Sequence, residues 1–174
     1  MAGAMNIDFL KHAPFAPGKV REVAVPPAAR RASTLTRIDY EDGFLVEGAS
    51  AWDRTPEAWA RAILEGAPRV LRDALSLAWS SLGLRIGSGR SDRLVHGWQI
   101  RRSTADLVLL GAGSRVGMPA ELLFKRQRSG LLFSTFVQQD NLLARATWAA
   151  IAVQHRGVVR YVLEQASSPE RHSR

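Results

Sequence analysis

The region from residue 97 to residue 153 alternates short apolar segments with turn-forming residues, and this alternation constrains the fold more than any other feature. The first four segments read GWQIRRS, ADLVLLGAG, MPAELLFKRQ and GLLFSTFVQQ, separated by Ser, Thr, Gly, Asp and Asn residues. Connections this short cannot hold a crossover helix, so consecutive strands must be antiparallel neighbours. The region therefore predicts an antiparallel meander. We expect its last segment, NLLARATWAAIAV, to be a strand too, because Trp, Ile and Val favour strands, although its alanines favour a helix.

Helical patterns flank this predicted meander. The Thr55-Pro56 pair is typical of a helix start, and a second helix with apolar residues at helical spacing follows over residues 68–82. A strand over residues 35–47 precedes both, and a C-terminal helix over residues 154–166 follows the meander. This order predicts an α+β fold in which one curved antiparallel sheet carries helices on one face.

The N-terminal residues lack any sustained periodicity. Residues 1–34 contain four of the eight prolines, so we expect an extended, partly disordered N-terminal arm with a short edge strand at Val20 to Val25. The packed domain then spans residues 35–168, and residues 169–174 form a disordered tail.

Composition excludes several kinds of function. The chain has no cysteine, which removes disulfides, zinc fingers and thiol chemistry. The longest stretches without a charged residue, 74–84 and 129–139, are each 11 residues long, too short for a transmembrane segment. The N-terminus lacks the basic start and apolar run of a secretory signal, so we expect a cytoplasmic protein.

The order of elements resembles the START-like superfamily, also called SRPBCC, polyketide-cyclase-like or helix-grip, over about residues 21–167. More narrowly, the chain is similar to an uncharacterised-domain family of that superfamily, whose function is unknown. The resemblance implies a cavity between the sheet and the C-terminal helix that binds a small apolar or amphipathic molecule; it implies no cofactor. The matching segments are Tyr40-Glu41-Asp42-Gly43-Phe44, Pro56 to Arg61, Gly97-Trp98, Leu109 to Ala112, and Trp148 followed by His155-Arg156.

Strand alternation selects the residues that would line such a cavity. If even-numbered positions of the segments GWQIRRS and MPAELLFKRQ face inward, their side chains point at the C-terminal helix, and Phe133 joins them from the next strand. Ligand binding and plain core packing both account for these side chains, and a structural domain with a filled core stays open, as does a homodimer. The candidates are Trp98, Ile100, Leu122, Phe124, Phe133, Trp148, His155 and Val159.

Few polar residues point to chemistry. His155 lies on the apolar face of the C-terminal helix, where it either orients a ligand or makes a hydrogen bond within the core. His96 is more typical of a surface histidine, and the loop 87–92 lacks the following helix that a phosphate loop needs, so we expect it to gate the cavity mouth. No histidine pair has metal-ligand spacing, so no metal site is expected. We expect Glu121 to face solvent beside an arginine, and no residue set specifies a reaction, so enzyme activity stays open.

A cluster of basic residues provides the alternative function. The formal net charge is +8, and the ends of two parallel-running strands bring basic side chains to one end of the sheet. They would suit a binding module for an anionic macromolecule, or simply form a solvated charged end. Nucleic acid is the less favoured partner because no aromatic platform accompanies the charges. The basic candidates are Arg101, Arg102, Lys125, Arg126 and Arg128.

Overall fold

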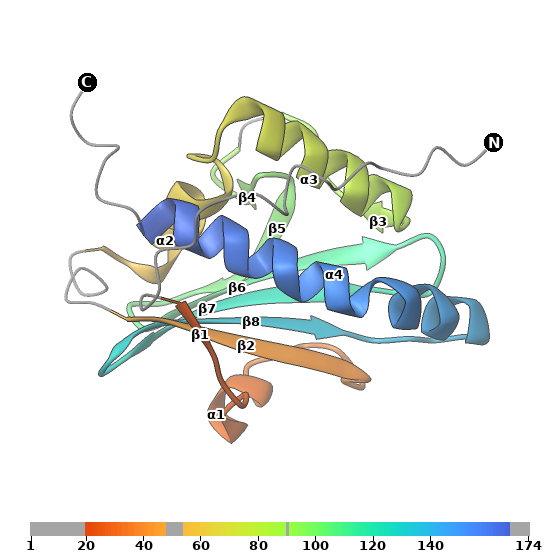
Figure 1. The fold of residues 1–174 in the computed structure, drawn as a ribbon, viewed down its shortest axis with the longest axis horizontal. Coiled ribbons are helices and arrows are strands. Elements are labelled where there is room, and N and C mark those ends of the chain that lie inside the picture. The colour runs from red at the N-terminus through yellow and green to blue at the C-terminus, as the bar shows by residue number, and fades with distance from the viewer. Residues whose placement is uncertain (1–19, 48–53, 90, 168–174) are drawn as a thin grey trace.

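The computed structural model describes residues 20–47, 54–89 and 91–167. Residues 1–19 and 168–174, which hold most of the predicted arm and the predicted tail, lie outside these ranges. The described residues form an eight-stranded antiparallel sheet with α2, α3 and α4 on one side and α1 on the other, which confirms the α+β class (Figure 1). The strands are β1 Val20–Glu22, β2 Tyr40–Glu47, β3 Leu84–Arg85, β4 Leu94–Val95, β5 Trp98–Ser103, β6 Leu107–Ser114, β7 Ala120–Gln127 and β8 Gly130–Val137. The helices are α1 Pro27–Arg30, α2 Pro56–Leu64, α3 Arg69–Ser81 and α4 Leu142–Ser167.

The strand order confirms the predicted meander over its first four segments. The order is β1-β2-β8-β7-β6-β5-β4, so β5, β6, β7 and β8 are consecutive neighbours, and β3 pairs with β6 outside this path. The strand β2 pairs with β8, which places the earliest long strand beside the latest. The predicted edge strand is confirmed in β1, and the predicted helix pair in α2 and α3. The two-residue strands β3 and β4 were not predicted.

The expectation of a fifth meander strand over residues 141–153 is wrong, because residues 142–153 form the first half of α4. Its helix start is capped: the Ala144 amide donates to Oδ1 of Asn141 at 2.8 Å. Alanine is the strongest helix former, and Ala144 and Trp148 continue the buried stripe that later includes Val162. Among the described residues, no helix combines the length and apolarity that crossing a bilayer requires.

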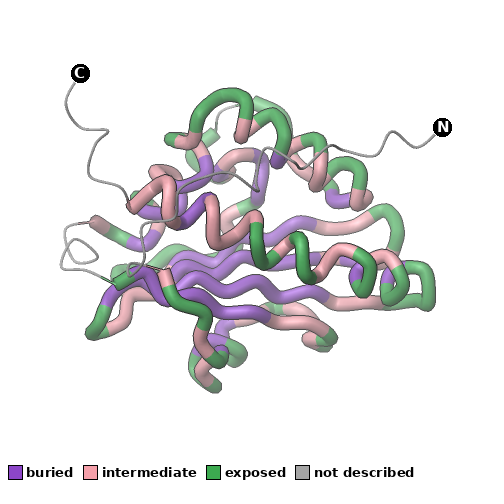
Figure 2. Tube along the Cα trace, viewed as in Figure 1, coloured by how far each residue is buried: buried purple, intermediate pink, exposed green. Residues whose placement is uncertain are grey.

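Both faces of the sheet are buried, which explains the nearly continuous apolar runs of its central strands. Every residue of β8 is buried (Figure 2). On the face toward α4, the cross-strand pairs Phe44 with Phe133 and Phe133 with Phe124 form one row of aromatic side chains across three strands. On the opposite face, Leu123 and Leu132 belong to a separate, smaller cluster. The sheet thus divides the core into two layers.

The smaller layer is covered by residues 20–34, which the sequence analysis assigned to an extended arm. Besides the predicted edge strand β1 they contain the helix α1, and Val25, Ala29 and Ala32 are buried against the sheet. The prolines did not prevent a helix, because a proline at the first helical position loses no hydrogen bond. Packing against the sheet therefore begins before residue 35.

Glu121 lies in this smaller layer and is fully buried, so the expectation that it faces solvent is wrong. Nη1 of Arg101 lies 3.3 Å from its carboxylate, which confirms the expected arginine partner. The Ser33 hydroxyl donates to the carboxylate at 2.6 Å, and the Thr34 amide at 3.1 Å, together with the Thr34 hydroxyl. A buried carboxylate needs such donors, so Glu121 fastens the segment after α1 to the sheet.

We expect the substitution Glu121→Gln to lower the free energy of unfolding in urea by about 2 kcal/mol, because Arg101 and the Thr34 amide lose a charged acceptor away from water. Amide hydrogen exchange at Thr34 should accelerate. The matched control is Glu47→Gln, which removes an exposed partner of Arg21 and should change stability by less than about 0.5 kcal/mol. Equal effects of the two substitutions would contradict the role given to Glu121.

The cap of α4 gives a second prediction about stability. Asn141→Ala removes the acceptor for the Ala144 amide and the donor to the Val116 carbonyl, 3.0 Å away. We expect unfolding measurements to show a loss of about 1 kcal/mol, and Asn141→Asp to recover most of it by restoring the acceptor. If Asn141→Asp were as destabilising as Asn141→Ala, the contact with Val116, not the cap, would hold the start of α4.

Candidate functional site

The predicted cavity residues all lie in the layer between the sheet and helices α2, α3 and α4. They belong to one contiguous apolar cluster, or in the case of His155 contact it from α4. Trp98, Leu122, Phe124, Phe133 and Trp148 are buried, and the other three candidates, Ile100, His155 and Val159, are partly buried.

Aromatic rings make edge-on contacts within this layer. The Phe124 and Phe133 rings lie 5.0 Å apart, and the Trp98 ring lies 5.3 Å from that of Trp79 on α3. Trp148 was expected on a strand, but it reaches the same layer from α4, where its ring lies 4.8 Å from that of Tyr40. Such edge-to-face geometry adds to the stability gained from burial.

Three tryptophans in this layer leave their indole N–H donors without a partner. The Nε1 atoms of Trp59, Trp98 and Trp148 are buried and make no hydrogen bond with any residue in the described part of the chain. All three side chains are more than nine-tenths buried and belong to the same cluster, which α2, β5 and α4 supply. Burying a donor without a partner costs its desolvation free energy. Three such indole donors are therefore the most unusual polar feature of this apolar layer.

A buried carboxylate, Asp42, interrupts the apolar surface under α4. Nε2 of His155 lies 3.1 Å from Oδ2 of Asp42, and the Tyr40 hydroxyl donates to the same oxygen at 2.9 Å. The Thr135 amide donates to Oδ1 at 3.2 Å, and Oγ1 of Thr135 lies 3.2 Å from Nε2 of His155. The cluster of Tyr40, Asp42, Thr135 and His155 therefore joins α4 to β2 and β8.

The geometry of this cluster limits its chemistry. In a nucleophilic triad, the carboxylate and the hydroxyl bind opposite nitrogens of the imidazole. Here Asp42 and Thr135 both contact Nε2 of His155, so no relay from one ring nitrogen to the other can form. Burial raises the pKa of the Tyr40 phenol far above its usual range, and the Asp42 carboxylate raises it further. Tyr40 therefore remains a neutral hydrogen-bond donor, and the cluster can orient a ligand but specifies no reaction.

Sequence reasoning identified His155 but not its partners. Asp42 and Tyr40 contributed to the family resemblance, but no role was assigned to them. A signal existed: Tyr40, Asp42, Phe44 and Val46 alternate on β2, and Asp42 is the one charged residue on that otherwise largely apolar face. Its partner could not be identified, because the contact with His155 depends on α4 being a continuous helix.

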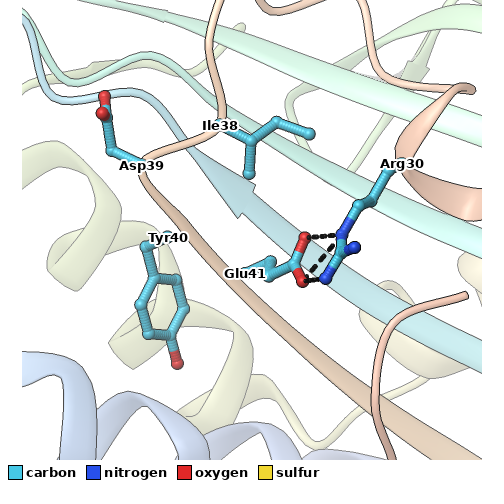
Figure 3. A pocket seen from close by; sticks show the side chains of 5 residues that line it. All are labelled: Arg30, Ile38, Asp39, Tyr40 and Glu41. Carbon is cyan, nitrogen blue, oxygen red and sulfur yellow. Dashed lines mark hydrogen bonds and ion pairs between the residues drawn. The ribbon is translucent and has the colours of Figure 1, made fainter. Parts of the chain in front are cut away.

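A pocket of about 260 Å³ lies on the outer side of β2, away from the predicted cavity residues. Arg30 of α1 and Glu41 form an ion pair at its wall, and Tyr40 points from the opposite side of the strand toward α4 (Figure 3). Ile38 and Asp39 complete the lining. Arg30 and Glu41 pair with each other and Asp39 pairs with Arg37 at 2.7 Å, and this pocket is separate from the candidate site.

A second pocket, of about 230 Å³, lies between α3 and the segment that carries β3 and β4. Its lining includes His96, which was expected to be an ordinary surface residue, together with Gly87 and Gly89 of the predicted gating loop. His96 is partly buried, and Nε2 of its ring lies 3.2 Å from the Ser76 hydroxyl. The loop therefore borders a pocket, but this pocket lies beside α3 and not under α4.

The predicted basic cluster does not form a uniform surface. A β-bulge between Ile100 and Arg102 shifts the register of β5, so Arg101 and Arg102 both turn toward the sheet face that α1 covers. Arg101 pairs with buried Glu121, and Nη2 of Arg102 lies 3.5 Å from the Ala32 carbonyl oxygen. These two arginines therefore help to attach the N-terminal segment.

The other three basic residues lie near the end of β7. Lys125 and Arg126 are partly buried, and Nη2 of Arg126 donates to the Arg54 carbonyl oxygen at 2.8 Å. Arg128 is exposed in the turn between β7 and β8. Of the five basic candidates, three thus make contacts within the fold.

No described group of three or more His, Asp or Glu side chains is placed to hold a metal ion. Comparisons with protein-family models, with curated proteins and with solved structures found no match to this chain. The candidate site therefore rests on geometry alone. It consists of the apolar layer, its three unpaired indole donors, and the cluster around Asp42.

The raised pKa of Tyr40 predicts how stability depends on pH. As the pH rises past about 10, the unfolded chain loses the Tyr40 proton while the folded chain keeps it, so folding stability must fall. We expect urea unfolding from about pH 8 to about pH 11 to show a shallower fall for Tyr40→Phe than for the natural sequence. Parallel pH curves for the two proteins would contradict the burial of the phenol.

Proposed function

We propose that the chain is a START-like, helix-grip domain that binds a small apolar or amphipathic molecule between the sheet and α4. Support for the fold comes from the antiparallel sheet, the preceding helix pair and the long C-terminal helix, in the order that the resemblance requires. A fold does not determine a function, so the ligand proposal needs support from the site itself.

The three unpaired indole donors carry the proposal. Ligand sites combine an apolar lining with a few placed polar groups, and this layer offers aromatic and aliphatic walls with the N–H groups of Trp59, Trp98 and Trp148. Carbonyl, ether or hydroxyl oxygens of a ligand would accept these hydrogen bonds and remove the cost of burying the donors unpaired. The Tyr40 and His155 side chains add polar groups at the α4 side. The ligand that fits best is therefore mainly apolar, with oxygen acceptors.

The alternatives receive less support. A purely structural domain with a filled core would have no use for unpaired buried donors. A binding module for an anionic macromolecule would need its arginines available, whereas Arg101, Arg102 and Arg126 contact other parts of the fold. Each alternative predicts a distinct outcome of the experiment below.

The direct test is native mass spectrometry of the protein purified from its natural host, before and after denaturation. We expect a bound molecule that denaturation releases. In parallel, 1-anilinonaphthalene-8-sulfonate, an amphipathic probe with sulfonate acceptors, should bind the ligand-free protein saturably. We expect Trp148→Phe to weaken this binding about fivefold, because it removes one donor and keeps an aromatic ring.

The matched control is Leu143→Ala, which removes an exposed apolar side chain of α4 outside the buried layer. It should leave probe binding within about twofold of the natural protein. An empty native spectrum without saturable probe binding would overturn the proposal in favour of a filled core. Saturable binding of duplex DNA at low salt, without small-molecule binding, would instead favour the basic alternative.

A further inference from the structure

The pocket beside α3 differs from the layer under α4 in having a polar and charged lining. Its volume is about 230 Å³. The cavity is therefore of a size for a small polar molecule and below the usual range for drug-sized ligands. Its lining residues are Glu65, Arg72, Ser76, Ile86, Gly87, Gly89, His96 and Gly97.

The sequence places a histidine where the backbone favours a different residue. Val95 pairs with Trp98, so His96 and Gly97 form a two-residue hairpin turn, and both have positive φ angles, 47° and 86°. Such turns favour Asn, Asp or Gly, and a histidine there has a conformational cost. The ring compensates by reaching α3, where Nε2 lies 3.2 Å from the Arg72 carbonyl oxygen. Because a carbonyl only accepts, Nε2 carries the proton, and Nδ1 of the neutral ring remains an acceptor.

The two charged groups in the lining differ in their partners. Oε1 of Glu65 accepts from the His96 amide at 3.0 Å and lies 3.4 Å from Nη1 of Arg61, which also pairs with Glu57 at 3.0 Å. Arg72 has no carboxylate within ion-pair distance in the described part of the chain, and its Nε is buried without a hydrogen-bond partner. The lining therefore holds one negative and one positive charge, and only the guanidinium of Arg72 lacks an oppositely charged partner among the described residues.

We propose that this pocket binds a small carboxylate, with Arg72 as the anchor. A guanidinium group binds a carboxylate through two parallel hydrogen bonds, and one such bond would satisfy the buried Nε. Because the carboxylate of Glu65 also lines the pocket, it would repel a phosphate dianion more strongly than a monoanion. Nδ1 of His96 and Glu65 offer acceptors to a donor on the ligand, so a hydroxy acid fits better than a plain fatty acid.

This site is independent of the proposed apolar ligand, although the two sites share a neighbour. The Trp79 ring lies 5.5 Å from that of His96 and 5.3 Å from that of Trp98. Trp79 thus separates the carboxylate pocket from the apolar layer.

The test is a titration of the ¹⁵N-labelled protein with sodium lactate, a small hydroxy acid, followed by NMR at the arginine Nε–H signals. Sodium chloride at the same ionic strength is the reference. We expect a saturable shift of the Arg72 signal with a Kd of about 1 mM, typical of a ligand with few atoms. Arg72→Gln should weaken binding at least about tenfold, as followed at the carbon-bound ring protons of His96.

Two further variants keep the test decisive. Arg69→Gln removes an exposed arginine of the same helix, paired with Asp73 at 3.7 Å, and should bind lactate as the natural protein does. Arg72→Lys keeps the charge but lacks the planar fork, so it should bind more weakly and serves if Arg72→Gln fails to fold. No saturable shift, an equal shift with chloride, or unchanged affinity in the Arg72 variants would each overturn the proposal.

Discussion

Two buried carboxylates, one on each face of the sheet, determine how the helices and the N-terminal segment attach to it. Glu121 lies on the face that α1 covers, and Asp42 on the face under α4. A charge removed from water is tolerated only where donors surround it, so each carboxylate requires a particular covering segment. Glu121 obtains its donors from residues 33–34 and from Arg101, and Asp42 obtains one of its donors from His155 on α4. Apolar packing alone would not determine which segment covers which face of the sheet.

The two layers differ in how completely the chain satisfies its own polar groups. The carboxylate of Glu121 has donors from three residues that the chain supplies itself. The layer under α4 contains the Asp42 cluster, which is also internally paired, but three indole donors there have no partner. In the smaller layer, the Ser134 hydroxyl is likewise buried without a partner among the described residues. Because native proteins rarely bury unpaired donors, the greater number under α4 supports placing the proposed ligand in that layer.

Sequence reasoning predicted the elements whose signal is local and failed where the outcome depended on distant contacts. Turn residues and strand alternation were enough for β5 to β8, and the Thr55-Pro56 start was enough for α2. The segment 142–153 has both strand-favouring and helix-favouring residues. It forms a helix because Asn141 caps its start and because Trp148 lies on the buried face that α4 continues to Val162. The bulge at Arg101 shows a second limit: one extra residue in β5 moved a side chain assigned to a charged end onto buried Glu121.

The candidate site shows the same division between local and distant information. Alternation alone brought Trp98, Phe124 and Phe133 to the correct face, since side-chain direction follows directly from strand parity. His155 was identified from its position on a helix face, but its role depends on Asp42, more than a hundred residues earlier in the sequence. That contact requires the pairing of β2 with β8, which no local pattern encodes. The apolar lining of such a site can therefore be predicted from strand alternation alone. Its polar contacts cannot, because they join residues that are distant in the sequence.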